Sequence, residues 1–182
     1  MKVNNLILTY FLIVPSSVFA ALNCSSNQDG CETVSGLLRS KLNFAGDTDL
    51  ILNNETILTL PTDEVDEAFV YNNLPYHKNN IKKIDQIIIS YNSNSCKLDD
   101  AEVNCTKYKL LNFKNKLIIS NAFYPKVANS NLMNVTWGTD NVLIKFEDSS
   151  VFEFKAGEIS LKSGGVEVRS DRFKSQDNIT SN

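Results

Sequence analysis

The feature that most constrains the fold of this chain is a series of short C-terminal segments in which apolar and polar residues alternate. Segments 142–147, 151–155, 158–162 and 166–170 start seven to nine residues apart, with Asp, Ser and Gly residues between them. Alternation with a period of two places neighbouring side chains on opposite faces of a strand, so one face is apolar and the other polar. This pattern predicts an antiparallel sheet with one buried face and one solvated face.

Segments upstream continue the strand pattern. The pair Asn53-Asn54 separates two apolar stretches and predicts a tight hairpin turn, because Asn tolerates the positive φ angles of such turns. Residues 84–91 are rich in β-branched and aromatic side chains, as expected of a central strand. Apolar residues with helical spacing occur only within residues 33–41. We therefore expect a mainly β fold, an antiparallel sandwich or jelly-roll-like meander, with at most one short helix near residues 33–41.

The N-terminal residues have the pattern of a cleavable secretory signal. A basic residue, Lys2, precedes an apolar run (residues 6–14), and Val18 and Ala20 occupy the −3 and −1 positions of a cleavage site. The apolar run is too short to cross a bilayer, which takes about 20 apolar residues, and no later segment is long enough. We expect residues 1–20 to be removed and the mature protein to be located in the periplasm or secreted.

The mature chain would comprise 162 of the 182 residues, the size of one ordinary domain with its own core. We expect residues 21–173 to form a single β-rich domain and the polar residues 174–182 to form a flexible tail. The formal net charge is −3, or −4 without Lys2. Such a mildly acidic chain lacks the basic surface that nucleic acid requires. The expected partner is therefore a protein, glycan or lipid of the envelope or extracellular space, with no transmembrane segment left after signal removal.

Four cysteines, an even number, predict disulfides in an exported chain. Three pairings are possible, and we favour Cys24–Cys31 and Cys96–Cys105 because each pair encloses a short polar segment with turn residues. Neither pair has the two-to-four-residue gap of a zinc site or the two-residue gap of a redox pair. We expect structural disulfides and no metal.

The sequence is poor in residues suited to catalysis. The one histidine, His77, follows Pro75 and Tyr76 in a turn-like segment, where solvent exposure is the ordinary outcome. No nucleophile elbow, zinc-binding His-Glu-x-x-His or phosphate loop is present. Two acidic clusters remain, and solvated loop charge is their simplest interpretation; they are Asp63, Glu64, Asp66 and Glu67, and Asp99, Asp100 and Glu102. We expect a protein that is not an enzyme and uses no cofactor.

Aromatic residues near strand ends are candidates for ligand binding. Trp137, which precedes Gly138, is the best candidate for stacking on a ligand, and Tyr124 is a second. Core packing is the alternative, and it is the commoner fate of a lone Trp beside an alternating strand.

Two C-terminal stretches resemble families of exported proteins. Residues 157–161 (Gly-Glu-Ile-Ser-Leu) and 165–171 (Gly-Val-Glu-Val-Arg-Ser-Asp) resemble one repeat of the OstA-like periplasmic lipopolysaccharide-transport proteins. That resemblance implies a lipid-carrying jelly roll. Residues 142–151 resemble the strand–Asp-Gly-Ser–strand turn of FecR-like periplasmic domains, with Ser149 where that family has Gly. Each match covers under a fifth of the chain.

These observations favour an exported, non-enzymatic β-sheet protein that binds or bridges an envelope or extracellular partner. Two alternatives stay open. The first is an OstA-like lipid or lipopolysaccharide carrier of the periplasm. The second is a carboxylate-dependent glycan hydrolase, which needs a pair of carboxylates at a suitable separation.

Overall fold

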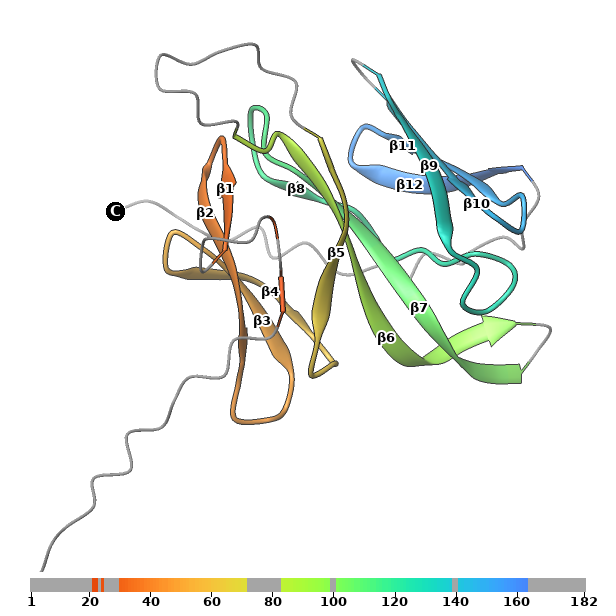
Figure 1. Ribbon diagram of the computed structural model, residues 1–182, viewed down its shortest axis with the longest axis horizontal. Coiled ribbons are helices and arrows are strands. Elements are labelled where there is room, and N and C mark those ends of the chain that lie inside the picture. The colour runs from red at the N-terminus through yellow and green to blue at the C-terminus, as the bar shows by residue number, and fades with distance from the viewer. Residues whose placement is uncertain are drawn as a thin grey trace, which may run out of the picture.

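The computed structural model describes residues 21–22, 24, 30–71, 83–98, 101–138 and 141–163, and within them it is all-β (Figure 1). The described residues form three antiparallel sheets of four strands each and contain no helix. The part of the chain that is described therefore has no helix that could cross a membrane. Several predicted features lie outside the described residues: the signal segment 1–20, His77, Asp99, Asp100, the segment 166–170 and the tail 174–182.

Each sheet is a run of consecutive strands in which neighbours along the chain pair with each other. Sheet A contains β1 (Cys31–Thr33), β2 (Gly36–Leu42), β3 (Thr48–Leu52) and β4 (Glu55–Leu60). Sheet B contains β5 (Val65–Tyr71), β6 (Gln86–Leu98), β7 (Ala101–Asn112) and β8 (Ile118–Ile119). Sheet C contains β9 (Leu132–Trp137), β10 (Asn141–Phe146), β11 (Val151–Lys155) and β12 (Glu158–Ser163). The predicted antiparallel, mainly β, sandwich-like fold is confirmed.

The sheets pack in three layers, with sheet B in the middle (Figure 1). On β6, the central strand predicted from residues 84–91, Ile87 and Ile89 face sheet A and Ile88 faces sheet C. All three side chains are fully buried. An uninterrupted apolar run is expected of a strand that is covered on both faces, whereas alternation is expected of the outer sheets. Sheet C has that alternation, since Phe152 and Phe154 are buried and their neighbours on β11 are not.

Each face of sheet B has its own core. The core between sheets A and B is mainly aliphatic and includes Leu38, Leu50, Leu60, Ile87, Ile89 and Leu111. The core between sheets B and C is built around four aromatic rings, whose centroids lie 5.0 to 6.3 Å apart in tilted or edge-to-face pairs. These rings belong to Tyr108, Phe123, Phe146 and Phe152. Tilted and edge-to-face packing is the favourable geometry for aromatic side chains.

The short helix considered near residues 33–41 is not present; this segment contains the β1–β2 hairpin. Gly36 stands at the turn with φ +128°, a conformation that does not occur within a helix. Leu38 is buried between half-buried neighbours and pairs with Leu52 of β3. Pairing with β3 thus outweighs the helical spacing of the leucines.

The predicted Asn53-Asn54 turn is confirmed, and it also joins two hairpins. Asn53 and Asn54 have φ angles of 51° and 72° and connect β3 to β4. The side-chain amide of Asn53 donates a hydrogen bond through its nitrogen to the Ser35 carbonyl (2.7 Å). Its oxygen accepts one from the Leu37 N–H (3.2 Å). The β3–β4 turn therefore fixes the β1–β2 turn beside it.

Both favoured disulfides are present, and the part of the chain that is described contains no free cysteine. Cys24–Cys31 lies at the core between sheets A and B, with a Cα–Cα distance of 4.9 Å. Cys96–Cys105 joins β6 to β7, with a Cα–Cα distance of 6.0 Å. Two disulfides fit an oxidising compartment such as the periplasm or the extracellular space.

Candidate functional site

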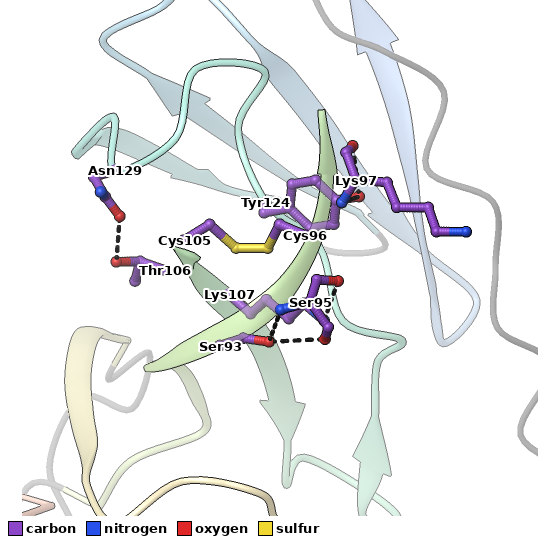
Figure 2. The surroundings of a disulfide bond; sticks show 9 residues. All are labelled: Ser93, Ser95, Cys96, Lys97, Cys105, Thr106, Lys107, Tyr124 and Asn129. Atoms are coloured by element: carbon purple, nitrogen blue, oxygen red, sulfur yellow. Dashed lines mark hydrogen bonds between the residues drawn. A yellow bond between two sulfur atoms is a disulfide. The ribbon is translucent and has the colours of Figure 1, made fainter. Parts of the chain in front are cut away.

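Tyr124, one of the two predicted ligand-binding residues, is hydrogen-bonded to an arm formed by β6 and β7. Tyr91 is the last residue of β6 that pairs with β5. Beyond it, β6 and β7 continue as a two-stranded ribbon, which the Cys96–Cys105 disulfide joins (Figure 2). The Tyr124 hydroxyl lies 3.3 Å from both the backbone nitrogen and the carbonyl oxygen of Lys97, so it can accept a hydrogen bond from the N–H and donate one to the carbonyl. Tyr124 thereby covers backbone groups at the open edge of β6, which is a structural role.

Trp137, the other predicted ligand-binding residue, stacks on Tyr71. The ring centroids lie 4.8 Å apart at an interplanar angle of 17°, and Lys114 Nζ lies 5.7 Å from the centroid of the Tyr71 ring. The stack links β5 of sheet B to β9 of sheet C at the upper end of Figure 1, whereas the arm that contacts Tyr124 is at the lower end. The structure therefore does not bring Trp137 and Tyr124 into one site.

The first acidic cluster is divided between solvent and the interior. Asp63, Glu64 and Asp66 are exposed. Glu67 is half-buried, and burial raises its pKa; its Oε2 atom is buried and has no hydrogen-bond partner. Asp66 and Glu67 are successive residues of β5 and point to opposite faces, so they cannot act as a facing pair of carboxylates. In the second cluster, the described member Glu102 is exposed near the start of β7.

Glu67 lies beside the Cys24–Cys31 disulfide. One carboxylate oxygen and the two sulfur atoms all lie within 4.8 Å of one another. Metal binding by cysteine requires thiolates, and these two sulfur atoms are bonded to each other. The cluster therefore offers a metal ion a single carboxylate.

Other titratable groups share the face of sheet B that points toward sheet A. Burial raises the pKa of Tyr91 to about 12. Burial, assisted by the neighbouring charge of Lys107, lowers the pKa of Lys109, whose ammonium donates to the Ser120 carbonyl (3.0 Å). Glu67 and Lys109 lie in one row across the sheet with Ile89 between them. An acid and a base separated by an apolar residue lack the hydrogen-bond contact that proton transfer needs.

The most exposed apolar side chain among the described residues is one that the sequence reasoning missed. Phe44, in the turn between β2 and β3, has a relative exposure of 113%. The next most exposed large apolar residues, Met133 and Val127, reach 60% and 57%. Single exposed apolar residues are common on protein surfaces, and Phe44 differs from the other exposed apolar residues of the described chain in the extent of its exposure. The available signal was the position of Phe44 among Asn, Ala, Gly and Asp residues, which are typical of a turn and not of a strand.

The turn that carries Phe44 is held by its own hydrogen bonds. The Asn43 side-chain oxygen accepts from the N–H groups of Ala45 (2.9 Å) and Asp47 (3.1 Å). The Asn43 N–H donates to the Asp47 carbonyl (2.8 Å), and the Gly46 N–H donates to the Asn43 carbonyl (3.2 Å). Gly46 has φ +86°, which permits the tight reversal without strain. The turn therefore projects the Phe44 ring from a backbone that is already ordered.

Comparisons with models of known protein families, with curated protein sequences and with solved structures return no match for this chain.

Proposed function

We propose that this protein is an exported, non-enzymatic binding protein that engages a protein of the envelope or extracellular space through the β2–β3 turn. The observation that carries the proposal is the full exposure of Phe44 on a turn held by four hydrogen bonds around Asn43. Aromatic side chains that enter a pocket of a partner dominate the energetics of many interfaces.

The energetics of such a contact are favourable. Complete burial of a phenylalanine side chain contributes about 1.5–3 kcal/mol relative to leaving it in water. A flexible loop would lose part of that gain because its backbone must be ordered on binding. The hydrogen bonds within the turn reduce this cost, since the backbone of residues 43–47 is already fixed in the free protein.

The interior of the protein supports the same proposal. Both faces of sheet B are covered by side chains of the protein itself, so its largest apolar surfaces are already used. Half-buried titratable groups such as Glu67 and Lys109 do not meet one another. Apolar surface that a partner can reach is thus found on the outside, and Phe44 provides the most exposed part of it.

The test is site-specific photo-crosslinking. Full-length protein carrying a photoreactive benzoyl-phenylalanine at position 44 is irradiated with an envelope extract and, separately, with the culture medium of its source. We expect a discrete protein adduct from position 44. An excess of unlabelled wild-type protein should reduce the amount of this adduct. The matched control carries the same photoreactive residue at Met133, which is exposed on β9 of sheet C.

The outcome of competition decides the proposal. Unlabelled F44A should fail to compete for the adduct, whereas unlabelled M133A should compete as well as wild type. Equal adducts from positions 44 and 133, or undiminished competition by F44A, would refute a binding role for the β2–β3 turn.

A further inference from the structure

The connection from β4 to β5 lies beside the turn that carries Phe44. Thr48, at the start of β3, pairs with Leu60 at the end of β4. The Thr48 hydroxyl donates a hydrogen bond to the Thr62 carbonyl (2.8 Å), which holds residues 61–64 against this end of sheet A. Figure 1 shows the β2–β3 turn and the β4–β5 connection together at the lower end of the molecule.

This arrangement places carboxylates at the same end of the molecule as the exposed ring. Asp63, Glu64 and Asp66 are exposed on the β4–β5 connection and the start of β5, and Asp47 follows Phe44 in its own turn. Asp49 lies on β3 opposite Lys41, an exposed basic residue of β2. We name the exposed ring and these carboxylates the acidic Phe44 surface; the residues are Phe44, Asp47, Asp49, Asp63, Glu64 and Asp66.

We propose that the acidic Phe44 surface binds a protein whose apolar pocket is bordered by lysine or arginine side chains. This inference rests on the proposed function and adds the chemistry of the partner to it. A central apolar anchor with a charged rim is the usual anatomy of a protein interface, and the rim selects partners of complementary charge. The carboxylates at the same end of the molecule as Phe44 therefore favour a basic rim on the partner.

The same charges argue against a membrane as the occupant. A bilayer with anionic head groups would be repelled by a surface with several carboxylates. Insertion of the Phe44 ring alone into a bilayer would bring Asp47 and the exposed Asp63 toward those head groups. A protein pocket can instead place its cationic groups opposite the carboxylates.

The experiment uses a defined mimic of such a pocket. The probe is a synthetic amphipathic helix of leucine and lysine, whose apolar face is bordered by ammonium groups. The matched probe contains glutamate in place of lysine, and vesicles of pure phosphatidylcholine provide an uncharged bilayer. Binding to purified full-length protein is measured by calorimetry and by NMR at low and moderate salt.

We expect the leucine–lysine helix to bind and the leucine–glutamate helix and the vesicles not to bind. F44A should weaken binding by about tenfold or more, as removal of an interface anchor does. D63N/E64Q should weaken it by about threefold at low salt and make it less dependent on salt. The control E102Q/E158Q removes the same number of charges from exposed positions on β7 and β12 and should leave binding unchanged.

Each other outcome overturns the inference. Binding that is equal for the two helices, or unaffected by D63N/E64Q, would refute the basic rim. Binding that is independent of Phe44, or Phe44-dependent adsorption to the vesicles, would refute the protein pocket. A failed helix experiment together with a Phe44-dependent crosslink would reject the basic partner and keep the proposed function, whereas failure of both experiments would reject both.

Discussion

The two faces of the central sheet are covered in different ways. On the side of sheet A, the core is mainly aliphatic, and it contains a disulfide and the half-buried Glu67. On the side of sheet C, the core is aromatic, and Asp148 holds a loop in place at its border. The comparison shows that one β-sheet can be stabilised by a covalent bond on one face and by ring packing on the other.

The largest expected effect comes from the aromatic core. Phe123 is fully buried and contacts the rings of Tyr108, Phe146 and Phe152. F123A should lower the free energy of unfolding by about 3–5 kcal/mol, because it removes a buried ring and leaves a cavity. The measurement is chemical denaturation followed by near-ultraviolet circular dichroism, which reports the packing of the rings.

The matched variant on the other face is L111A, which removes a fully buried leucine from the core between sheets A and B. We expect about 2–5 kcal/mol of destabilisation. Hydrogen exchange should then separate the two faces, with faster exchange in β10 and β11 for F123A and in β2 and β3 for L111A. If each variant accelerates exchange equally in both outer sheets, the two interfaces form a single cooperative unit. The two faces of sheet B would then not differ in their local stability.

The second effect concerns the disulfides. C24S/C31S should destabilise the protein by about 2–3 kcal/mol, because the bond closes a short loop in the unfolded chain. C96S/C105S removes a bond of similar loop length from the β6–β7 arm. We expect it to accelerate hydrogen exchange in residues 92–98 and 101–106 while the global denaturation midpoint falls less than for C24S/C31S. A larger global loss from C96S/C105S would show that the arm, and not the core of sheet A, depends on covalent stabilisation.

Local patterns predicted the strands, but long-range contacts decided how they are covered. Alternation identified β10 and β11, and the run Ile87–Ile89 marked a central strand because no polar residue interrupts it. Which sheet covers which face depends on contacts between residues far apart in the sequence, such as Phe123 with Phe152. The residues around Phe44 indicate a turn, but the hydrogen bonds that hold this turn are known only from the structure.

On the side of sheet C, hydrogen bonds in the turn between β10 and β11 attach a loop to the core, as the Cys24–Cys31 disulfide does covalently on the side of sheet A. The Asp148 carboxylate accepts hydrogen bonds from the N–H groups of Val127 (2.8 Å) and Ser150 (2.9 Å). Ser149 has φ 70°, a conformation that favours Gly, at the position where the FecR-like turn has Gly. The loop before β9 is thereby attached to the edge of the aromatic core.

The third expected effect is an acid-sensitive contribution from Asp148. Burial alone would raise the pKa of Asp148, but the hydrogen bonds from Val127 and Ser150 outweigh it and lower the pKa below its ordinary value. The stabilisation is therefore present above the unfolded pKa of about 3.9 and is lost as the pH falls through the lower folded value. D148N should cost up to about 1 kcal/mol at pH 7, since the site is partly exposed, and almost nothing at pH 2. Urea denaturation at both pH values measures this, and an equal cost at both would exclude a role for the charge.

Glu67, on the face toward sheet A, should behave in the opposite way and with the smallest effect. Burial raises the pKa of Glu67, so the folded state favours the protonated carboxyl. The contribution of Glu67 to the free energy of unfolding is therefore fully present below the unfolded pKa of about 4.3. It is lost as the pH rises through the pKa of the folded state. E67Q has no charge to bury and should be more stable than wild type at pH 7, by less than about 1 kcal/mol because the side chain is partly exposed.

The difference between E67Q and wild type should vanish at pH 3, where both side chains are neutral. Denaturation midpoints of both proteins between pH 3 and pH 8 measure it, and E64Q, at an exposed position, should show no such trend. If E67Q is instead less stable than wild type at pH 7, the ionised carboxylate beside Cys24–Cys31 stabilises the fold. The two faces of the central sheet would then share the same response to acid, because both Asp148 and Glu67 would act in their charged forms.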